Sequence, residues 1–94
     1  AVVALPGGCG TMEELFEVIT LKRLGLFTKP IIILNTNGYY DLIKQFLQQM
    51  VDEHFMGQTH ADMYTFVDEP HEVIQAIQNA PDWGSDAIRF AALR

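Results

Sequence analysis

The sequence predicts an α/β fold, a Rossmann-like three-layer α/β/α arrangement with a mainly parallel sheet. Short apolar runs alternate with longer stretches of helical periodicity, in the order β-α-β-α-β-α. Each apolar run ends in turn-forming residues, and no repeat or linker interrupts the order. Successive strands joined by a helix run parallel through right-handed crossovers. We therefore expect residues 1–94 to form a single unit, the C-terminal half of such a domain.

The first unit joins a strand to a helix. Residues 1–5 (AVVAL) are apolar without alternation, which is typical of a strand buried on both faces. Helical spacing begins at Thr11, and Gly25 offers a stop. The expected apolar face carries Leu15, Phe16 and Ile19, with Met12 as a further candidate, whereas Glu13, Glu17 and Lys22 lie elsewhere on the helix.

The second unit contains the clearest strand, residues 30–34 (PIIIL), which ends in the turn formers of residues 35–38 (NTNG). Residues 40–55 then predict an amphipathic helix that closes near Gly57. The expected apolar side carries Ile43, Leu47, Met50 and Val51, and the polar side carries Asp41, Lys44, Gln48 and Asp52.

The third unit has a strand over residues 63–67 and a short helix that Pro81 ends. The helix start is acidic, at residues 68–70 (DEP), which suits the positive end of the helix dipole. Residues 82–94 are expected to form a final helix that packs on a missing segment or on a partner.

Composition and charge exclude several classes of function. The net charge is −6 with only six Lys and Arg, which argues against nucleic acid as a partner. No apolar run approaches the ~20 residues of a membrane span, and no signal peptide is visible. The single Cys9 cannot form an internal disulfide, so we expect a cytoplasmic protein without a membrane partner.

The hydrophobic content is high for a short chain, at 49% with 11% aromatic residues. A domain of this size encloses a small core. We therefore expect part of the apolar surface to face another chain or a missing segment. Because the sequence opens at Ala1 directly into an apolar run, we also expect the N-terminal part of a longer protein to be absent.

Three glycines, Gly7, Gly8 and Gly10, lie between the first strand and the first helix, at the sheet edge where open parallel sheets bind ligands. Glycine permits positive φ angles and close approach of a ligand, and a helix N-terminus favours an anion. The spacing matches neither the Walker A motif nor the dinucleotide fingerprint. Phosphate binding and a plain strand–helix turn are the two alternatives.

Several polar residues have structural interpretations. Thr11 and Glu14 have the spacing of a capping box, and Glu13 and Glu17 suit the helix dipole. Tyr39 and Tyr40 follow a strand at the binding edge and either touch a ligand or cap the core. The three histidines show no metal-binding spacing and are expected to be exposed or partly buried, so no metal site is predicted (His54, His60, His71).

The segment Pro6-Gly7-Gly8-Cys9-Gly10-Thr11-Met12-Glu13-Glu14 resembles the PGGxGTxxE signature of the Lonely guy family, also labelled "lysine decarboxylase-like". The resemblance continues through residues 15–20 (LFEVIT), Lys29-Pro30, Asn35 and residues 38–40 (GYY), and it covers roughly the first 80 residues. Members are cytokinin-activating phosphoribohydrolases, or relatives that cleave nucleoside 5′-monophosphates to a free base and ribose 5-phosphate.

The resemblance implies a site for a small-molecule nucleoside monophosphate in a homodimer. The catalytic residue would be Glu14, at the ribose, and the 5′-phosphate would be held by the loop from Gly7 to Thr11. The residues that would bind substrate are Gly7, Gly8, Cys9, Gly10, Thr11, Met12, Glu13, Glu17 and Thr20. Cys9 stands at the family's variable position and would contribute its backbone.

A carboxylate at Glu14 would stabilise the ribosyl cation that forms as the N-glycosidic bond breaks. This chemistry requires no metal or redox cofactor. A decarboxylase dependent on pyridoxal phosphate is not predicted, because no lysine lies in a recognisable context for that cofactor. The alternative is a non-catalytic module that binds a nucleotide or a phosphorylated cofactor.

Two features depart from the family pattern. Leu21 stands where members usually carry Trp, which puts the shape of the pocket in doubt. The family's upstream motif, a catalytic Arg followed by Lys, is absent from this chain. Half an active site is therefore expected here, and nothing in it clearly protonates the leaving base.

Overall fold

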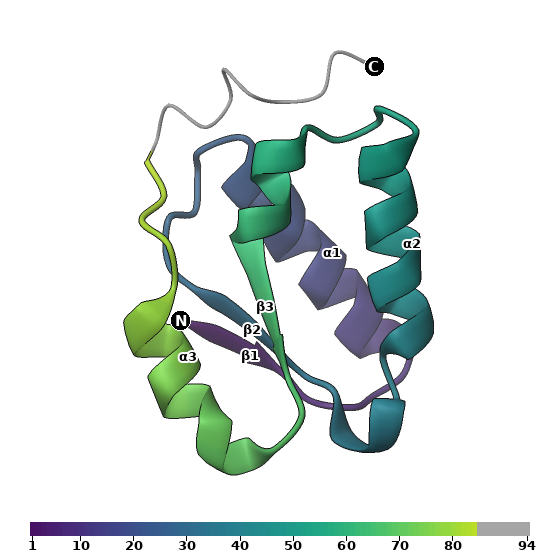
Figure 1. The fold of residues 1–94 in the computed structure, drawn as a ribbon, viewed down its shortest axis with the longest axis vertical. Helices are drawn as coiled ribbons and strands as arrows, with labels where there is room; N and C mark the ends of the chain where they lie inside the picture. The colour runs from purple at the N-terminus through teal and green to yellow at the C-terminus, as the bar shows by residue number, and fades with distance from the viewer. Residues whose placement is uncertain (85–94) are drawn as a thin grey trace.

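The computed structural model describes residues 1–84, in which strands and helices alternate in the expected order (Figure 1). The strands are β1 (Val2–Ala4), β2 (Ile31–Leu34) and β3 (Tyr64–Val67), and the helices are α1 (Cys9–Arg23), α2 (Asp41–Asp52) and α3 (Val73–Asn79). Short 3-10 helices precede α2, β3 and α3 (Thr36–Gly38, Gln58–Met63, Pro70–Glu72). Residues 82–84 are not helical, and the rest of the predicted final helix lies outside the described residues.

The sheet is parallel with the order β1-β2-β3, so the predicted α/β class is confirmed. The β1-α1-β2 and β2-α2-β3 connections each lead to the next strand in the same direction along the sheet. Right-handed crossovers in one direction place their helices on the same face, and α1 and α2 accordingly share one face while α3 covers the other (Figure 1). The result is the three-layer arrangement that the sequence predicts.

The central strand β2 holds the two halves of the core together. All four of its residues are buried. Because side chains alternate along a strand, Ile31 and Ile33 pack in the cluster with α1 and α2, whereas Ile32 and Leu34 pack in the cluster with α3. The strand predicted over residues 30–34 is confirmed, and it is buried on both faces of the sheet.

The first strand is less buried than its apolar sequence predicts. Ala4 is buried on the α1 and α2 face, but Val3 points to the other face and is 38% exposed. The reason is that α3 packs on β2 and β3, and β1 is the strand at the far edge of the sheet from β3. The prediction that β1 is covered on both faces is therefore wrong within the described residues.

Lys22 was expected away from the apolar face of the first helix, and the structure corrects this. Its side chain is 2% exposed, and its ammonium group donates to the carbonyl of Lys29 at 2.9 Å. The ammonium also lies 5.7 Å from the ring centroid of Trp83, whose indole N–H donates to the Lys22 carbonyl at 2.7 Å. Burial lowers the pKa of Lys22. A long alkyl chain lets the residue cross apolar surface and still reach a polar partner.

His60 is likewise more buried than expected. It has no exposed surface and lies with its ring 5.9 Å from the ring of Trp83. His54 and His71 are exposed, as predicted. Among residues 1–84, no three His, Cys, Asp or Glu side chains gather as a metal would require, and no helix is long and apolar enough to cross a bilayer.

Candidate active site

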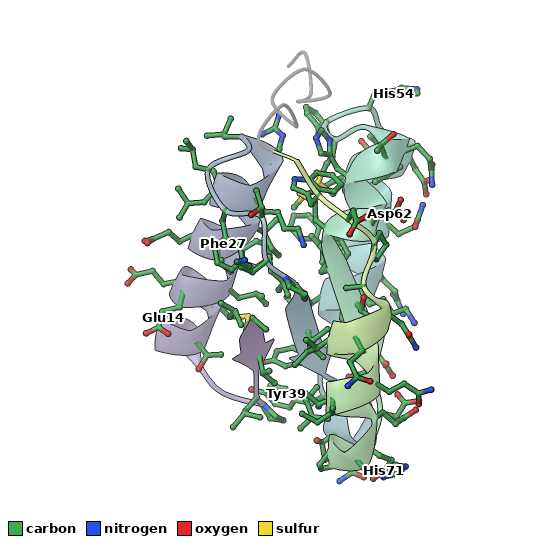
Figure 2. The ribbon with its side chains drawn as sticks, turned by 90° about the vertical axis from the view of Figure 1, so that its left-hand side faces the viewer. Glu14, Phe27, Tyr39, His54, Asp62 and His71 are labelled. Carbon is green, nitrogen blue, oxygen red and sulfur yellow. The ribbon has the colours of Figure 1, made fainter. Side chains whose placement is uncertain are left out.

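Two connections meet at the carboxyl edge of the sheet. The segment after β1 contains the glycines, and the segment after β2 contains the tandem tyrosines Tyr39 and Tyr40. Figure 1 shows both connections at the same end of the molecule, and Figure 2 places Tyr39 beside the segment that leads into α1. Parallel sheets bind ligands at their carboxyl edge, and the predicted site residues of the loop and of α1 begin at this edge.

The amino end of α1 is open for an anion. The helix begins at Cys9 with Gly8 as its N-cap, and no side chain among the described residues caps it. The first bond of the helix runs from the Met12 amide to the Gly8 carbonyl at 3.0 Å. The amides of Cys9, Gly10 and Thr11 precede this bond and have no partner within the helix. Amides in this position, at the positive end of a 15-residue helix, suit a phosphate group.

The capping-box interpretation of Thr11 and Glu14 is wrong. Because α1 begins two residues earlier than expected, Thr11 is the third residue of the helix and Glu14 the sixth. Glu14 is therefore too far along the helix to reach back to the N-cap amide. A capping box does form at the predicted acidic start before α3, where Glu72 accepts from the Glu69 amide at 2.8 Å.

None of the loop glycines Gly7, Gly8 and Gly10 has a positive φ angle. They instead allow close packing and leave open space for a ligand. A Cβ at Gly7 would lie 2.3 Å from the hydroxyl oxygen of Thr11, so the Thr11 side chain packs directly on the loop backbone. Gly8 and Gly10 face open space. Positive φ occurs among the described glycines at Gly25 and Gly38, outside this loop. The loop therefore keeps its surface clear on the side where a ligand would approach.

The remaining predicted residues divide between two sides of α1. Met12 packs against the core and Cys9 is exposed with a free thiol. The acidic residues point outward along the helix, and Figure 2 shows Glu14 directed away from the sheet into solvent. Thr20 is also exposed, and its hydroxyl donates to the Phe16 carbonyl at 2.8 Å. The exposed stripe that starts at the loop thus contains Glu13, Glu14, Glu17 and Thr20.

Two tyrosine hydroxyls from the β2–α2 connection donate hydrogen bonds to backbone carbonyls of the segment between β1 and α1. Tyr40 is buried and donates to the Leu5 carbonyl at 2.5 Å, and Tyr39 donates to the Gly7 carbonyl at 2.6 Å. Desolvation by burial raises the pKa of Tyr40, so its hydroxyl keeps the proton that it donates. The expectation that a tyrosine caps the core is correct for Tyr40, but the contacts with the loop backbone were not predicted.

A buried asparagine fixes this second connection in turn. The Asn35 side chain accepts from the Tyr40 amide at 2.6 Å and donates to the Asp41 carboxylate at 2.8 Å. Asp41 also packs beside Gly38, where a Cβ would lie 2.6 Å from the Asp41 carboxylate and where the φ of +72° favours glycine. Buried polar groups of this kind are satisfied by fixed partners. Sequence reasoning assigned Asn35 and Gly38 to a turn and missed that the turn supports the site.

Fold and site together define a class: a parallel α/β protein with an open, glycine-flanked helix start at the carboxyl edge of its sheet. The family is identified by comparison, because the model of the family described as "Possible lysine decarboxylase" matches residues 1–77. The chain belongs to this family. The resemblance noted from the PGGxGTxxE signature is confirmed.

Curated relatives are named for one activity. The chain is 41% identical over 78 residues to "Cytokinin riboside 5'-monophosphate phosphoribohydrolase LOG2" of Arabidopsis thaliana, a match that covers 83% of this chain and 37% of that protein. It is 52% identical over 57 residues to "Probable cytokinin riboside 5'-monophosphate phosphoribohydrolase LOGL3" of Oryza sativa subsp. japonica, which covers 61% of this chain and 27% of that protein. The matched part of the chain thus spans 37% of the length of the first relative and 27% of the second.

Proposed function

We propose that this chain contributes the phosphate-binding half of the active site of a nucleoside 5′-monophosphate phosphoribohydrolase. The reaction adds water across the N-glycosidic bond and releases a free base and ribose 5-phosphate. The observation that carries the proposal is the uncapped start of α1, where Gly8 and Gly10 face open space, in a chain whose curated relatives are named cytokinin riboside 5'-monophosphate phosphoribohydrolases. The protein is proposed to work in the cytoplasm.

The loop would bind the 5′-phosphate through the backbone amides from Gly8 to Thr11. Backbone amides and the helix dipole hold an anion without basic side chains, which fits a chain of net charge −6. Binding energy from the phosphate, remote from the reacting bond, would position the sugar for reaction.

Glu14 would be the catalytic residue. It lies five residues beyond Cys9, about 7.5 Å along the helix axis at 1.5 Å per residue, and on the exposed stripe. A ribose whose phosphate rests at the helix start could extend along this stripe. The Glu14 carboxylate would then stabilise the positive charge that develops on the ribosyl ring as the base departs.

Other residues of the same stripe would line the substrate. Glu13, Glu17 and Thr20 are exposed beside Glu14 and are proposed to contact the ribose or base. Cys9 would contribute its backbone amide, and Met12 would shape the site from the core side. The proposed mechanism uses no metal or redox cofactor, and the group that protonates the leaving base would come from outside these residues.

The direct test is an assay of the full-length protein with AMP and other nucleoside 5′-monophosphates. We expect release of the free base together with ribose 5-phosphate, measured by chromatography. Nucleosides without the 5′-phosphate should react far more slowly, because they cannot use the loop. Binding of AMP without release of base from any monophosphate would favour the second candidate function, a nucleotide-binding module.

We also propose that the protein forms a homodimer through an apolar surface on α2. Leu42 is 77% exposed, and Phe46 lies one turn further along the same face of the helix. Phe46 and the exposed Phe55, which follows α2, line a hollow of about 330 Å³. Contiguous exposed apolar residues of this kind mark contact surfaces.

Sedimentation should show a dimer at micromolar concentration, and Phe46→Glu should shift it towards monomer. Leu26→Glu, which places a charge at an exposed leucine outside α2, is the control and should leave the dimer intact. A wild-type protein that sediments as a monomer would contradict the proposal.

A further inference from the structure

The peptide unit between Gly7 and Gly8 is the part of the loop that most needs an external restraint. Glycine accepts both signs of φ, so a peptide flanked by two glycines can turn over with little steric hindrance. This is the one Gly-Gly pair in the sequence. If the plane turned over, the Gly8 amide would exchange places with the Gly7 carbonyl. A carbonyl oxygen facing the site would repel a phosphate.

One side chain holds this plane. The Tyr39 hydroxyl donates to the Gly7 carbonyl oxygen at 2.6 Å, across 32 residues of sequence. The peptide bond is planar and no described peptide is cis. The Gly7 carbonyl and the Gly8 amide therefore point in opposite directions. Fixing the carbonyl on Tyr39 turns the Gly8 amide away from Tyr39.

Tyr39 is itself well supported although its ring is 55% exposed. The ring packs edge-on against Tyr40, with centroids 5.0 Å apart at an interplanar angle of 75°. Tyr40 is anchored by its hydroxyl bond to Leu5 and by its amide bond to Asn35. The two packed tyrosines thus donate hydrogen bonds to the carbonyls of Leu5 and Gly7, on either side of Pro6.

We propose that Tyr39 is a positioning residue, whose hydroxyl selects the orientation of the Gly7–Gly8 peptide that presents the Gly8 amide to the 5′-phosphate. The inference rests on the proposed function for its substrate class. Tyr39 acts on the loop and touches no reacting atom. Its loss should therefore weaken phosphate binding and leave the chemical step unchanged.

The test is Tyr39→Phe in the full-length protein, which removes the hydroxyl and keeps the ring. A net hydrogen bond of typical strength corresponds to roughly a 2- to 12-fold change in an equilibrium constant. KM and Kd for AMP should rise by this factor while kcat stays the same. In the ligand-free protein, the NMR order parameter of the Gly8 amide should fall from about 0.85, typical of rigid backbone, to below about 0.6.

Tyr64→Phe is the matched control. Tyr64 begins β3, at the opposite edge of the sheet from the loop, and its burial raises the pKa of its hydroxyl to about 12. This variant should change neither KM nor the Gly8 order parameter. A Gly8 amide with neither a lower order parameter nor new relaxation dispersion in Tyr39→Phe would overturn the proposal, even if KM rose, because Tyr39 would then be touching the ligand directly.

The same measurements separate this inference from the proposed function. If the wild-type protein binds AMP but releases no base, the hydrolase proposal fails, and the Gly8 order parameter and the Kd for AMP still decide the role of Tyr39. If the wild-type protein binds neither AMP nor inorganic phosphate, the loop is no phosphate site and both proposals are wrong.

Discussion

Glu14→Gln in the full-length protein is expected to slow base release by roughly 100- to 1000-fold, or about 3–4 kcal/mol, while AMP affinity changes little. The size of the effect is that of losing one placed electrostatic stabiliser of a developing charge. Affinity should persist because the amides from Gly8 to Thr11 would hold the phosphate. The measurements are the rate constant of base release in a single turnover and Kd from a binding titration.

Stability should also persist in this variant. Glu14 is exposed and lies beyond the first turn of α1, so it neither packs in the core nor caps the helix. Exposed substitutions of this type usually change the free energy of unfolding by less than about 0.5 kcal/mol. A thermal melt therefore separates a catalytic loss from a structural one.

Glu53→Gln provides the matched control for charge. It makes the same substitution at an exposed residue next to the far end of α2, where the Glu53 side chain accepts from Gln49. Its base release should equal that of the wild type. If Glu14→Gln also turned over nucleotide at the wild-type rate, the catalytic role would have to be assigned to another residue.

Gly8→Val is expected to remove AMP binding, with a loss of at least about 100-fold in affinity, and to leave the fold intact. No atom lies within 4 Å of a Cβ at Gly8, so a side chain there begins in open space before the helix start. A phosphate at this place would lose several charge-assisted hydrogen bonds, each worth about 1.5–3 kcal/mol. Isothermal titration with AMP measures the loss.

Gly7→Ala gives the contrast that makes this test specific. A Cβ at Gly7 would meet the Thr11 hydroxyl at 2.3 Å, so the loop must deform. This variant should lower the melting temperature, whereas Gly8→Val should not. Full AMP affinity in a folded Gly8→Val protein would show that the nucleotide binds elsewhere.

Most of the fold could be predicted from the sequence because local periodicity and topology rules agree. The run Ile31–Leu34 is apolar at every position, and β2 is buried on both faces. The predicted apolar residues of α2 are its buried or partly buried ones. Parallel order then follows from the alternation of strands and helices. Each of these inferences depends on residues that are near one another in the sequence.

Two predictions about the first helix were wrong: the position of Lys22 and the residue at which α1 begins. Lys22 was placed on the polar side, because no local pattern shows that Lys29 and Trp83 surround its ammonium group. The start of α1 was misplaced because Gly8 caps the helix without a side chain, and a Thr-x-x-Glu spacing suggested a different cap. Tertiary contacts decide the position of Lys22, whereas the first residue of α1 is decided locally by the backbone at Gly8.

The candidate site could be predicted in part. The glycine spacing indicated a strand–helix connection, and the structure places Gly7 and Gly8 between β1 and the uncapped start of α1. The support from Tyr39 and Tyr40 could not be derived, because it consists of side-chain bonds to backbone carbonyls 32 and 35 residues away. Carbonyl acceptors leave no trace in an amino-acid sequence. The only available signal was the pair of aromatic residues that follows the second strand.

Trp83 has a practical consequence for spectroscopy. It is the single tryptophan of this chain, and it lies over Lys22 and beside Thr28 and Pro30, near the amino end of β2. The proposed nucleotide site is at the opposite end of the sheet. Trp83 fluorescence will therefore report when residues 80–84 detach from α1 on unfolding. Nucleotide occupancy will need a separate probe, such as a fluorescent nucleotide analogue.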